Sequence, residues 1–320
     1  MSTSPFDDIT DASARHRQSR WHSVLDSDLF HAFRRSPLTM IAAAVTVAFF
    51  VLAICAPLIA VQNPFDPAQL ELLNSRIPPL WSSEGQAPFL LGTDEQGRDV
   101  FSAILYGLRI SLSVGVLGML LAGTLGTGLG LIAGYFGGRI DSVIMRIADI
   151  QLTFPAILIA LLIDGVAKSL LGNHLNAAQT LTVLVVAIGL SFWVQYARTV
   201  RSSVMVEKGK DYVAAARLVG LPARTIMLRH VLPNATGPIL VLVTINLALA
   251  IITEATLSFL GSGMPDTMPS LGTLIRIGNN YLFSGEWWIV TFPGLALAML
   301  ILAINLVGDW LRDALNPKLR

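Results

Sequence analysis

Long apolar runs recur along the chain and are separated by shorter polar stretches. Four of them carry no charged residue: residues 38–61, 110–136, 180–197 and 287–308. A helix needs about 20 apolar residues to cross the hydrocarbon core of a bilayer. Each of these runs therefore predicts one membrane-spanning helix.

Two further apolar runs contain or adjoin charged residues, and the first is short. Residues 150–163 provide only 14 positions between Asp149 and Asp164. We therefore expect this helix to begin near Val143 and to include Arg146 and Asp149. Side chains three positions apart share one face of a helix, which favours a structural ion pair between Arg146 and Asp149.

The second of these two runs lies between Asn234 and Gly263 and contains Glu254. A carboxylate inside a span costs a few kcal/mol unless it is paired, hydrated or protonated. Counted from Gly237, Glu254 lies about 26 Å along the helix, which places it near the external end. Glu254 is thus a candidate residue of the translocation path or of its outer gate. The alternative is a snorkelling or interfacial carboxylate.

The distribution of Lys and Arg predicts the orientation. Seventeen of the 22 basic residues fall in the two tails and the loops after the second and fourth spans, and five fall in the other loops. Basic residues concentrate on the cytoplasmic side. Both termini are therefore expected in the cytoplasm.

The pattern as a whole predicts an all-α polytopic membrane protein with six transmembrane helices. Charged residues make up 13% of the chain, against roughly 25% in soluble domains. The first run is too long for a cleaved signal peptide. The expected segments are a cytoplasmic tail (1–37), a first transmembrane helix (38–61), a periplasmic loop (62–109), a five-helix core (110–310) and a cytoplasmic tail (311–320).

Several kinds of chemistry are not indicated by the sequence. Cys55 is the single cysteine, so a disulfide within the chain is impossible. The five histidines show no pair at metal-ligand spacing, and no metal site is expected. No G-x-x-x-x-G-K-[ST] pattern occurs, so the chain has no phosphate loop of that kind for ATP. The net charge is +1, and no nucleic-acid partner is expected.

Small residues recur every four positions along the second span. Ala122, Gly126, Gly130 and Gly134 fall on one helix face. Such a face lets two helix backbones approach closely. The pattern predicts tight helix packing rather than a particular chemistry.

The most basic loop contains the stretch "DYVAAARLVGLPARTIMLRHVLPNA", residues 211–235. Asp211 is expected to cap a short helix, and Gly220 to end it in the left-handed conformation. Pro222 suits the first turn of a second short helix, which Pro233 is expected to stop. We call this predicted helix–glycine–helix segment the elbow.

The second helix of the elbow is expected to be about 12 Å long. Its side chains mix basic and apolar character: Arg224, Ile226, Met227, Arg229, His230 and Val231. Two interpretations remain open from these residues alone. The elbow either inserts into a groove on a cytoplasmic partner or lies on anionic lipid.

The elbow resembles the EAA loop of binding-protein-dependent ABC importer permeases. That pattern has Glu-Ala-Ala, a glycine after three intervening residues and a Leu-Pro pair further on. Ala214-Ala215-Ala216, Gly220 and Leu232-Pro233 match its spacing. Ala214 replaces the usual glutamate, and His230 replaces an aliphatic residue, as in the peptide branch.

Three other stretches resemble the dipeptide, oligopeptide and nickel permeases. They are "LLGTDEQGRDVFSAILYGLRISLSVG" from Leu90, "TEATLSFLGSGMP" from Thr253 and "NLVGDWLRDALNPKLR" from Asn305. The resemblance covers most of residues 90–320. It implies a type I ABC importer transmembrane domain in the bacterial inner membrane.

The resemblance also implies partners and a site. The partners are a second homologous permease forming a heterodimer, two ATP-binding subunits that hold ATP and Mg²⁺, and a periplasmic or lipid-anchored substrate-binding protein. The site is a cytoplasmic ATPase-coupling loop, residues 198–236. Its expected coupling residues are Ala214, Ala215, Ala216, Arg217, Gly220, Pro222, Arg224, Ile226, Arg229, His230, Leu232 and Pro233.

The external loop before the second span offers a candidate docking surface for the binding protein. Asp94 and Gly97 read as a turn, with Arg98 beside it, and Asp99 as a helix N-cap. A solvated loop followed by a capped helix is the alternative. The acidic residues do not have the spacing of a calcium loop.

The expected substrate is a short peptide. External charges of both signs suit a zwitterion: Asp94, Asp99, Glu254 and Glu286 for an ammonium group, and Arg98 and Arg276 for a carboxylate. A nickel or other small-solute permease is the alternative within the family. An ion-coupled secondary transporter would instead favour inverted repeats and broken helices, and a membrane scaffold would leave the elbow unexplained.

Overall fold

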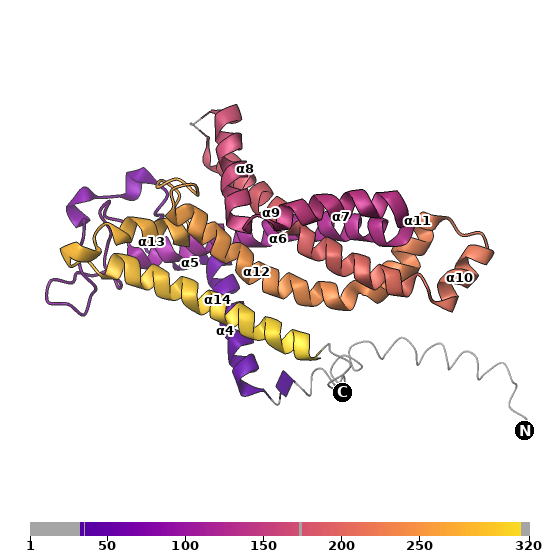
Figure 1. The fold of residues 1–320 in the computed structure, drawn as a ribbon. Helices are drawn as coiled ribbons and strands as arrows, with labels where there is room; N and C mark the ends of the chain where they lie inside the picture. Colours follow the sequence, from indigo (N-terminus) through magenta and orange to yellow (C-terminus); the bar gives the residue numbers. More distant parts are fainter. Residues whose placement is uncertain (1–32, 35, 173–174, 315–320) are drawn as a thin grey trace, which may run out of the picture.

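The computed structural model describes residues 33–34, 36–172 and 175–314. Four of the five histidines and most of both expected tails lie outside this part of the chain. Within it, the secondary structure is helical apart from one isolated bridge between Thr93 and Asp99. Figure 1 shows an elongated bundle with short helices and loops at both ends.

Long apolar helices form the bundle. The described residues contain five helices that are long and apolar enough to cross a membrane, or six if one bent pair counts as a single span. The long helices are α4 (Pro37–Ile54), α6 (Val100–Phe136), α9 (Ala177–Glu207), α12 (Thr236–Phe259) and α14 (Trp288–Ala314), and the bent pair is α7 (Gly138–Leu152) with α8 (Ala156–Leu171).

Several helix ends differ from the expected segment boundaries. Helix α4 ends at Ile54 and is followed by the short helix α5 (Ala56–Ile59). Helix α6 begins ten positions before the expected residue 110, so the loop that precedes it ends at Asp99. Helix α9 extends to Glu207, and α14 to Ala314. An apolar run marks the membrane-buried part of a helix, whereas backbone hydrogen bonds continue through charged residues at its ends.

The third predicted span is not a single straight helix. Helices α7 and α8 meet at 95°, and Pro155 occupies the N-cap of α8 with extended backbone angles. Because proline disfavours the α conformation in the residue before it, the helix breaks there. Helix α7 lies along the bundle while α8 projects from it (Figure 1).

The predicted Arg146–Asp149 pair is wrong. Asp149 instead forms an ion pair with Arg198 of α9. Asp141, in the first turn of α7, forms another with Arg201, which also belongs to α9. These pairs fasten α7 to α9. The tertiary neighbour supplied a better partner than the helix itself.

The small-residue face of α6 packs directly on α9, as predicted. Ala122 is fully buried. A Cβ added at Gly126 or Gly130 would meet the carbonyl oxygen of Trp193 or Ala197 at a separation that real Cβ atoms essentially never show. Glycine is therefore required at both positions for the two backbones to touch.

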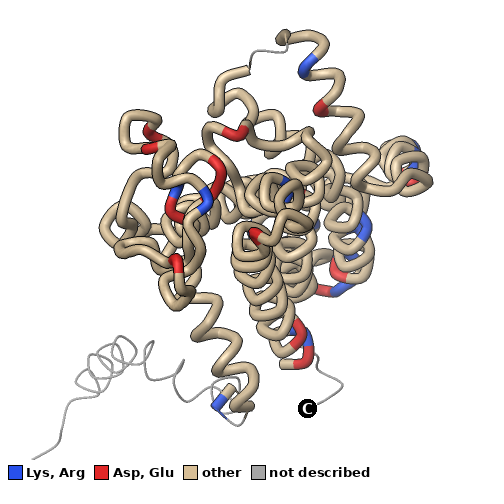
Figure 2. Tube along the Cα trace, turned by 90° about the vertical axis from the view of Figure 1, so that its left-hand side faces the viewer, with Lys and Arg blue, Asp and Glu red and all other residues tan. Residues whose placement is uncertain are grey.

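The loop before α6 is attached to the start of α14 and to the loop before α13. The Trp288 indole at the start of α14 donates to the Thr93 carbonyl oxygen over 3.1 Å. The Arg98 guanidinium donates to the carbonyl oxygen of Asp266, in the loop before α13 (Leu271–Asn279), over 2.7 Å. Figure 2, which views this end, shows basic and acidic segments intermixed in the loops.

Candidate coupling site

The first arm of the elbow is helix α10 (Asp211–Leu218), and Gly220 ends it as predicted. Gly220 has φ +80°. The Leu221 N–H donates to the Ala216 carbonyl over 3.1 Å, and the Gly220 N–H to the Arg217 carbonyl over 3.0 Å. This pair of bonds is the Schellman motif, which turns the chain sharply at Gly220.

The predicted helix cap at Asp211 is wrong. Lys210, not Asp211, holds the N-cap position, and Asp211 is the first helical residue. An acidic side chain in the first turn still interacts favourably with the helix dipole. The N-cap position is thus set by where the chain leaves α9, three residues earlier, rather than by the best capping side chain.

The second arm does not stop at Pro233. Pro222 is the N-cap of α11 (Ala223–Thr225), which continues through a π-helical turn, η3 (Ile226–Val231), and a 3-10 turn, η4 (Leu232–Ala235), into α12. Pro233 lies in the first turn of η4, where its missing N–H is tolerated more easily. The second arm and the transmembrane helix α12 are therefore one continuous helical element.

A buried apolar face holds both arms against the bundle. The residues that form it come from α6, α9, α10 and the second arm: Leu131, Val200, Val204, Val213, Ala216, Ile226 and Val231. Val213 and Ala216 lie three positions apart on one face of α10 and are 0% and 8% exposed, and Ile226 is 1% exposed. The elbow is thus a packed extension of the helix bundle.

Polar contacts of Glu207 fix the start of the elbow. Its carboxylate accepts hydrogen bonds from the Lys210 ammonium over 2.6 Å and from the Tyr212 hydroxyl over 2.7 Å. Burial, followed by this bond to Glu207, raises the pKa of Tyr212. The hydroxyl therefore remains a proton donor at neutral pH. The Asn234 amide closes the other end by donating to the His230 carbonyl over 2.7 Å.

Two cations connect the elbow to the C-terminal end of α6. The Lys208 ammonium donates to the Gly134 carbonyl over 2.8 Å, and the Arg217 guanidinium lies 5.3 Å from the centre of the Tyr135 ring. A cation at a helix C-terminus and a cation over an aromatic face are both stabilising. Sequence reasoning missed Lys208 and Tyr135, because each of these contacts joins residues that lie far apart in the chain.

The predicted coupling residues divide by exposure. Exposed are Ala214, Ala215, Arg217, Gly220, Pro222, Arg224, Arg229 and Pro233; half-buried are His230 and Leu232; buried are Ala216 and Ile226. Exposed residues are available to a partner, whereas Ala216 and Ile226 support the arms from beneath. The candidate site is thus a surface on a packed scaffold.

An apolar tip was missed by the sequence analysis. Leu218 and Val219, at the corner of the elbow, are 90% and 80% exposed. Adjacent exposed apolar side chains are typical of an interaction surface. Their position directly before the turn glycine was the available signal, since an ordinary solvated turn favours polar residues there.

The four candidate docking residues of the external loop are buried, so they do not form a docking surface. Asp94, Arg98 and Asp99 are 2%, 0% and 0% exposed, and Gly97 is buried too. Asp94 accepts from the Arg98 side chain over 2.6 Å. Asp99 is the N-cap of α6, as predicted, and accepts from the Ser102 N–H over 2.8 Å. Burial raises the pKa of Asp99, against the opposing effect of its bonds from Ser102.

Glu254 is fully buried, which rules out the interfacial alternative in this conformation. Its carboxyl group accepts hydrogen bonds from the Ser111 hydroxyl of α6 over 2.8 Å and from the Ser258 hydroxyl over 2.7 Å. The Ser270 hydroxyl, the N-cap of α13, continues the chain by donating to Ser258 over 3.1 Å. Glu254 therefore joins α6, α12 and the start of α13, and its role in a gate stays a prediction.

Comparison with protein families decides the identity of the fold. Residues 126–320 match the family described as "Binding-protein-dependent transport system inner membrane component", and residues 25–79 match "N-terminal TM domain of oligopeptide transport permease C". The chain belongs to the binding-protein-dependent permease family. This family is the one that the elbow motif predicted.

Characterised relatives cover nearly the whole permease. The dipeptide transport system permease protein DppC of Haemophilus influenzae is 40% identical over 269 residues, which are 84% of this chain and 86% of the relative. DppC of Escherichia coli K12 is 40% identical over 293 residues, which are 92% and 93%. DppC of Bacillus subtilis is 35% identical over 293 residues, which are 92% and 86%.

A solved structure shares the fold. It is the MetNI methionine ABC transporter in inward-facing conformations, with a TM-score of 0.52 and 18% identity, covering 67% of this chain and 96% of that one. The predicted all-α permease fold is confirmed. The permease is a multi-pass inner-membrane subunit that works with a substrate-binding protein, and ATP hydrolysis belongs to separate ATPase subunits.

Proposed function

We propose that this permease moves short peptides, di- or oligopeptides, into the cell. The observation that carries the proposal is the 40% identity to dipeptide permeases over 92% of the chain. ATP and Mg²⁺ are bound by the partner ATPases, and this chain needs no cofactor of its own.

The elbow is proposed to transmit the movement of an ATPase. An ATP-driven closure displaces the exposed tip at Leu218 and Val219, together with Arg217, Arg224 and Arg229. Because the second arm continues into α12 without a break, the displacement passes directly to a helix of the bundle. The bundle then alternates between inward-open and outward-open states.

The permease is proposed to act as a heterodimer with a second, homologous permease. Two ATPase subunits need two docking elbows, and this chain contributes one.

Uptake of labelled peptides tests the proposed function. In vesicles that contain this chain, the second permease, both ATPases and the binding protein, we expect ATP-dependent uptake of a labelled dipeptide. Omission of this chain should abolish it, and omission of the second permease should do the same. Full uptake without the second permease would contradict the heterodimer, and ATP-dependent nickel uptake without peptide uptake would contradict the peptide assignment.

Topology reporters test the proposed orientation, in which both termini are cytoplasmic. A reporter fused after Arg224 is expected on the cytoplasmic side and one fused after Glu84 on the periplasmic side, because 17 of 22 basic residues fall on the elbow's side. Alkaline phosphatase and a fluorescent protein give opposite readouts of the two compartments. The reverse pattern would overturn the orientation.

A further inference from the structure

One cation on the external side is left without an acidic partner. The five basic residues assigned to this side are Arg76, Arg98, Arg109, Lys168 and Arg276. Four of them form salt bridges, which are Arg76–Glu286, Arg98–Asp94, Lys168–Asp164 and Arg276–Asp266. Among the described residues, Arg109 has no salt bridge. The two arginines first considered as carboxylate receptors, Arg98 and Arg276, are therefore already neutralised.

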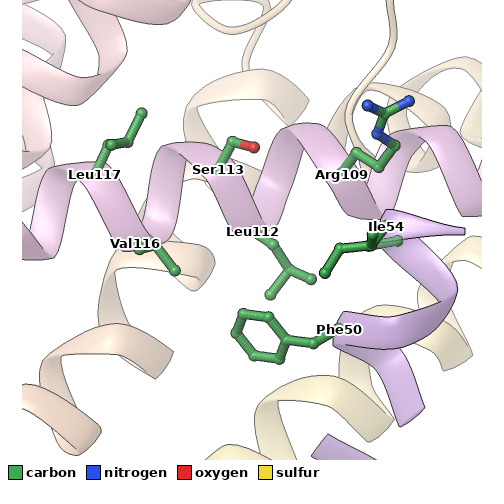
Figure 3. A pocket seen from close by; sticks show the side chains of 8 residues that line it. Phe50, Ile54, Arg109, Leu112, Ser113, Val116 and Leu117 are labelled. Carbon is green, nitrogen blue, oxygen red and sulfur yellow. The ribbon is translucent and has the colours of Figure 1, made fainter. Parts of the chain in front are cut away.

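Arg109 is exposed and lies at the rim of a groove. Its guanidinium lies 5.7 Å from the centre of the Tyr106 ring, a contact that does not use its N–H donors. The groove has a volume of about 430 Å³ and runs between α6 and the external end of α4. Figure 3 shows Arg109, Ser113 and Leu117 along one edge of α6, with Phe50 and Ile54 of α4 nearby.

The exposed face of α6 that carries Arg109 mixes polar and apolar side chains. Arg109, Ser113 and Thr124 are exposed on it, together with Leu117 and Leu120. The large exposed side chains of α8 and α14 are apolar: Leu158, Leu162, Val166 and Leu170 on α8, and Leu295, Met299 and Leu302 on α14. Ionisable residues within spans almost always face a bundle interior or a water-filled cavity. By this rule the part of α6 around Arg109 faces a water-filled path, whereas the exposed faces of α8 and α14 suit lipid.

We propose that Arg109 binds the C-terminal carboxylate of the transported peptide as it enters the groove. The inference rests on the proposed function, because it requires a peptide substrate. A guanidinium presents a fork of donors that matches a carboxylate bidentately. Ser113, one helical turn further along α6, supplies a hydroxyl for the adjoining peptide bond. The apolar side of the groove, from Phe50 to Leu112, accommodates variable side chains, and its volume falls in the range of small-molecule sites.

A pair of peptides that differ only at the C-terminus tests the inference. The complete importer is reconstituted in liposomes, and the binding protein is loaded to saturation with labelled trialanine or with trialanine amide. Uptake is divided by the amount of loaded binding protein, which removes the binding protein's own preference. The variants are Arg109→Gln, Arg109→Lys and, as a matched control, Arg76→Gln, which removes an external arginine outside the groove. Stimulation of ATPase activity by the loaded binding protein reports docking and assembly separately.

The wild-type complex is expected to transport the free acid about tenfold faster than the amide, as a charge-assisted hydrogen bond to a carboxylate predicts. Arg109→Gln should lower free-acid uptake by about the same factor and leave amide uptake unchanged. Arg109→Lys should retain only part of the preference, because an ammonium group cannot make the bidentate contact. Arg76→Gln should retain all of it, and ATPase stimulation should persist in every variant.

Three results would overturn the inference. One is an unchanged acid-to-amide ratio in Arg109→Gln, and another is an equal fall for both peptides. The third is a dependence of the Arg109→Gln effect on the fraction of phosphatidylglycerol in the liposomes, which would assign Arg109 to a lipid phosphate. A wild-type complex that takes up neither peptide would overturn the proposed function and, with it, this inference.

Discussion

Replacing Gly220 by valine is expected to reduce transport about five- to thirtyfold at matched membrane levels, because the left-handed conformation costs an L-residue about 1–2 kcal/mol. Gly220 has φ +80°, and a Cβ there would meet nothing within 4 Å. The effect therefore comes from the backbone conformation and not from a steric clash. Loss of that conformation removes the two Schellman bonds and changes the angle at which the tip meets the ATPase.

Two control variants separate the turn from general damage to the loop. Gly220→Asn should retain most transport, since asparagine tolerates the left-handed conformation better than other residues. Gly209→Val places the same side chain in the same loop where φ is not positive, and the nearest atom to its Cβ is the Val206 carbonyl oxygen at 3.6 Å. ATP-dependent peptide uptake and membrane abundance are measured together. Wild-type uptake by Gly220→Val would contradict a role for the turn in coupling.

Replacing Gly126 and Gly130 together by alanine is expected to destabilise the helix bundle more than any change at its surface. Each added methyl group would occupy the space of a backbone carbonyl oxygen of α9, at Trp193 or Ala197. Overpacking of this kind costs about 1–3 kcal/mol at each site. The two helices must separate, and a lower midpoint of thermal unfolding in detergent and lower membrane abundance should follow.

Gly128→Ala is the matched control for this prediction. Gly128 lies on the same helix between the two sites, and a Cβ there would meet nothing within 4 Å. The substitution should leave the unfolding midpoint unchanged or raise it, because alanine favours a helix over glycine by about 0.5–1 kcal/mol. Equal destabilisation by Gly128→Ala would show that helix flexibility, and not close packing on α9, explains the glycines.

The α6–α9 contact shows why some features were predictable from sequence. A four-residue repeat of small side chains specifies a helix face, and a face so shaped has few uses other than backbone contact. The same holds for Gly220, where a single residue type marks a backbone conformation. The elbow's spacing predicted its family because the motif lies in one continuous stretch of chain.

Other predictions failed where the answer depended on residues distant in the sequence. The Arg146–Asp149 pair was plausible along one helix, but Arg198 of α9 lies closer to Asp149 once α7 packs against it. The docking candidates around Asp94 looked like a solvated turn, yet Arg98 reaches the Asp266 carbonyl 168 positions away. Charge in a loop predicts exposure only when no other loop covers it.

The sequence by itself determined the membrane class, the apolar runs that span the bilayer, the elbow and its glycine turn, since each depends on local composition or spacing. Only the tertiary structure decided the break between α7 and α8, the burial of Glu254, the continuity of the elbow with α12 and the exposed tip at Leu218 and Val219. It also showed that, among the external cations, Arg109 is the one left without an acidic partner in the described chain. The physical reason is that burial and ion pairing are set by which segments pack together, and that information lies in contacts between residues far apart in the chain.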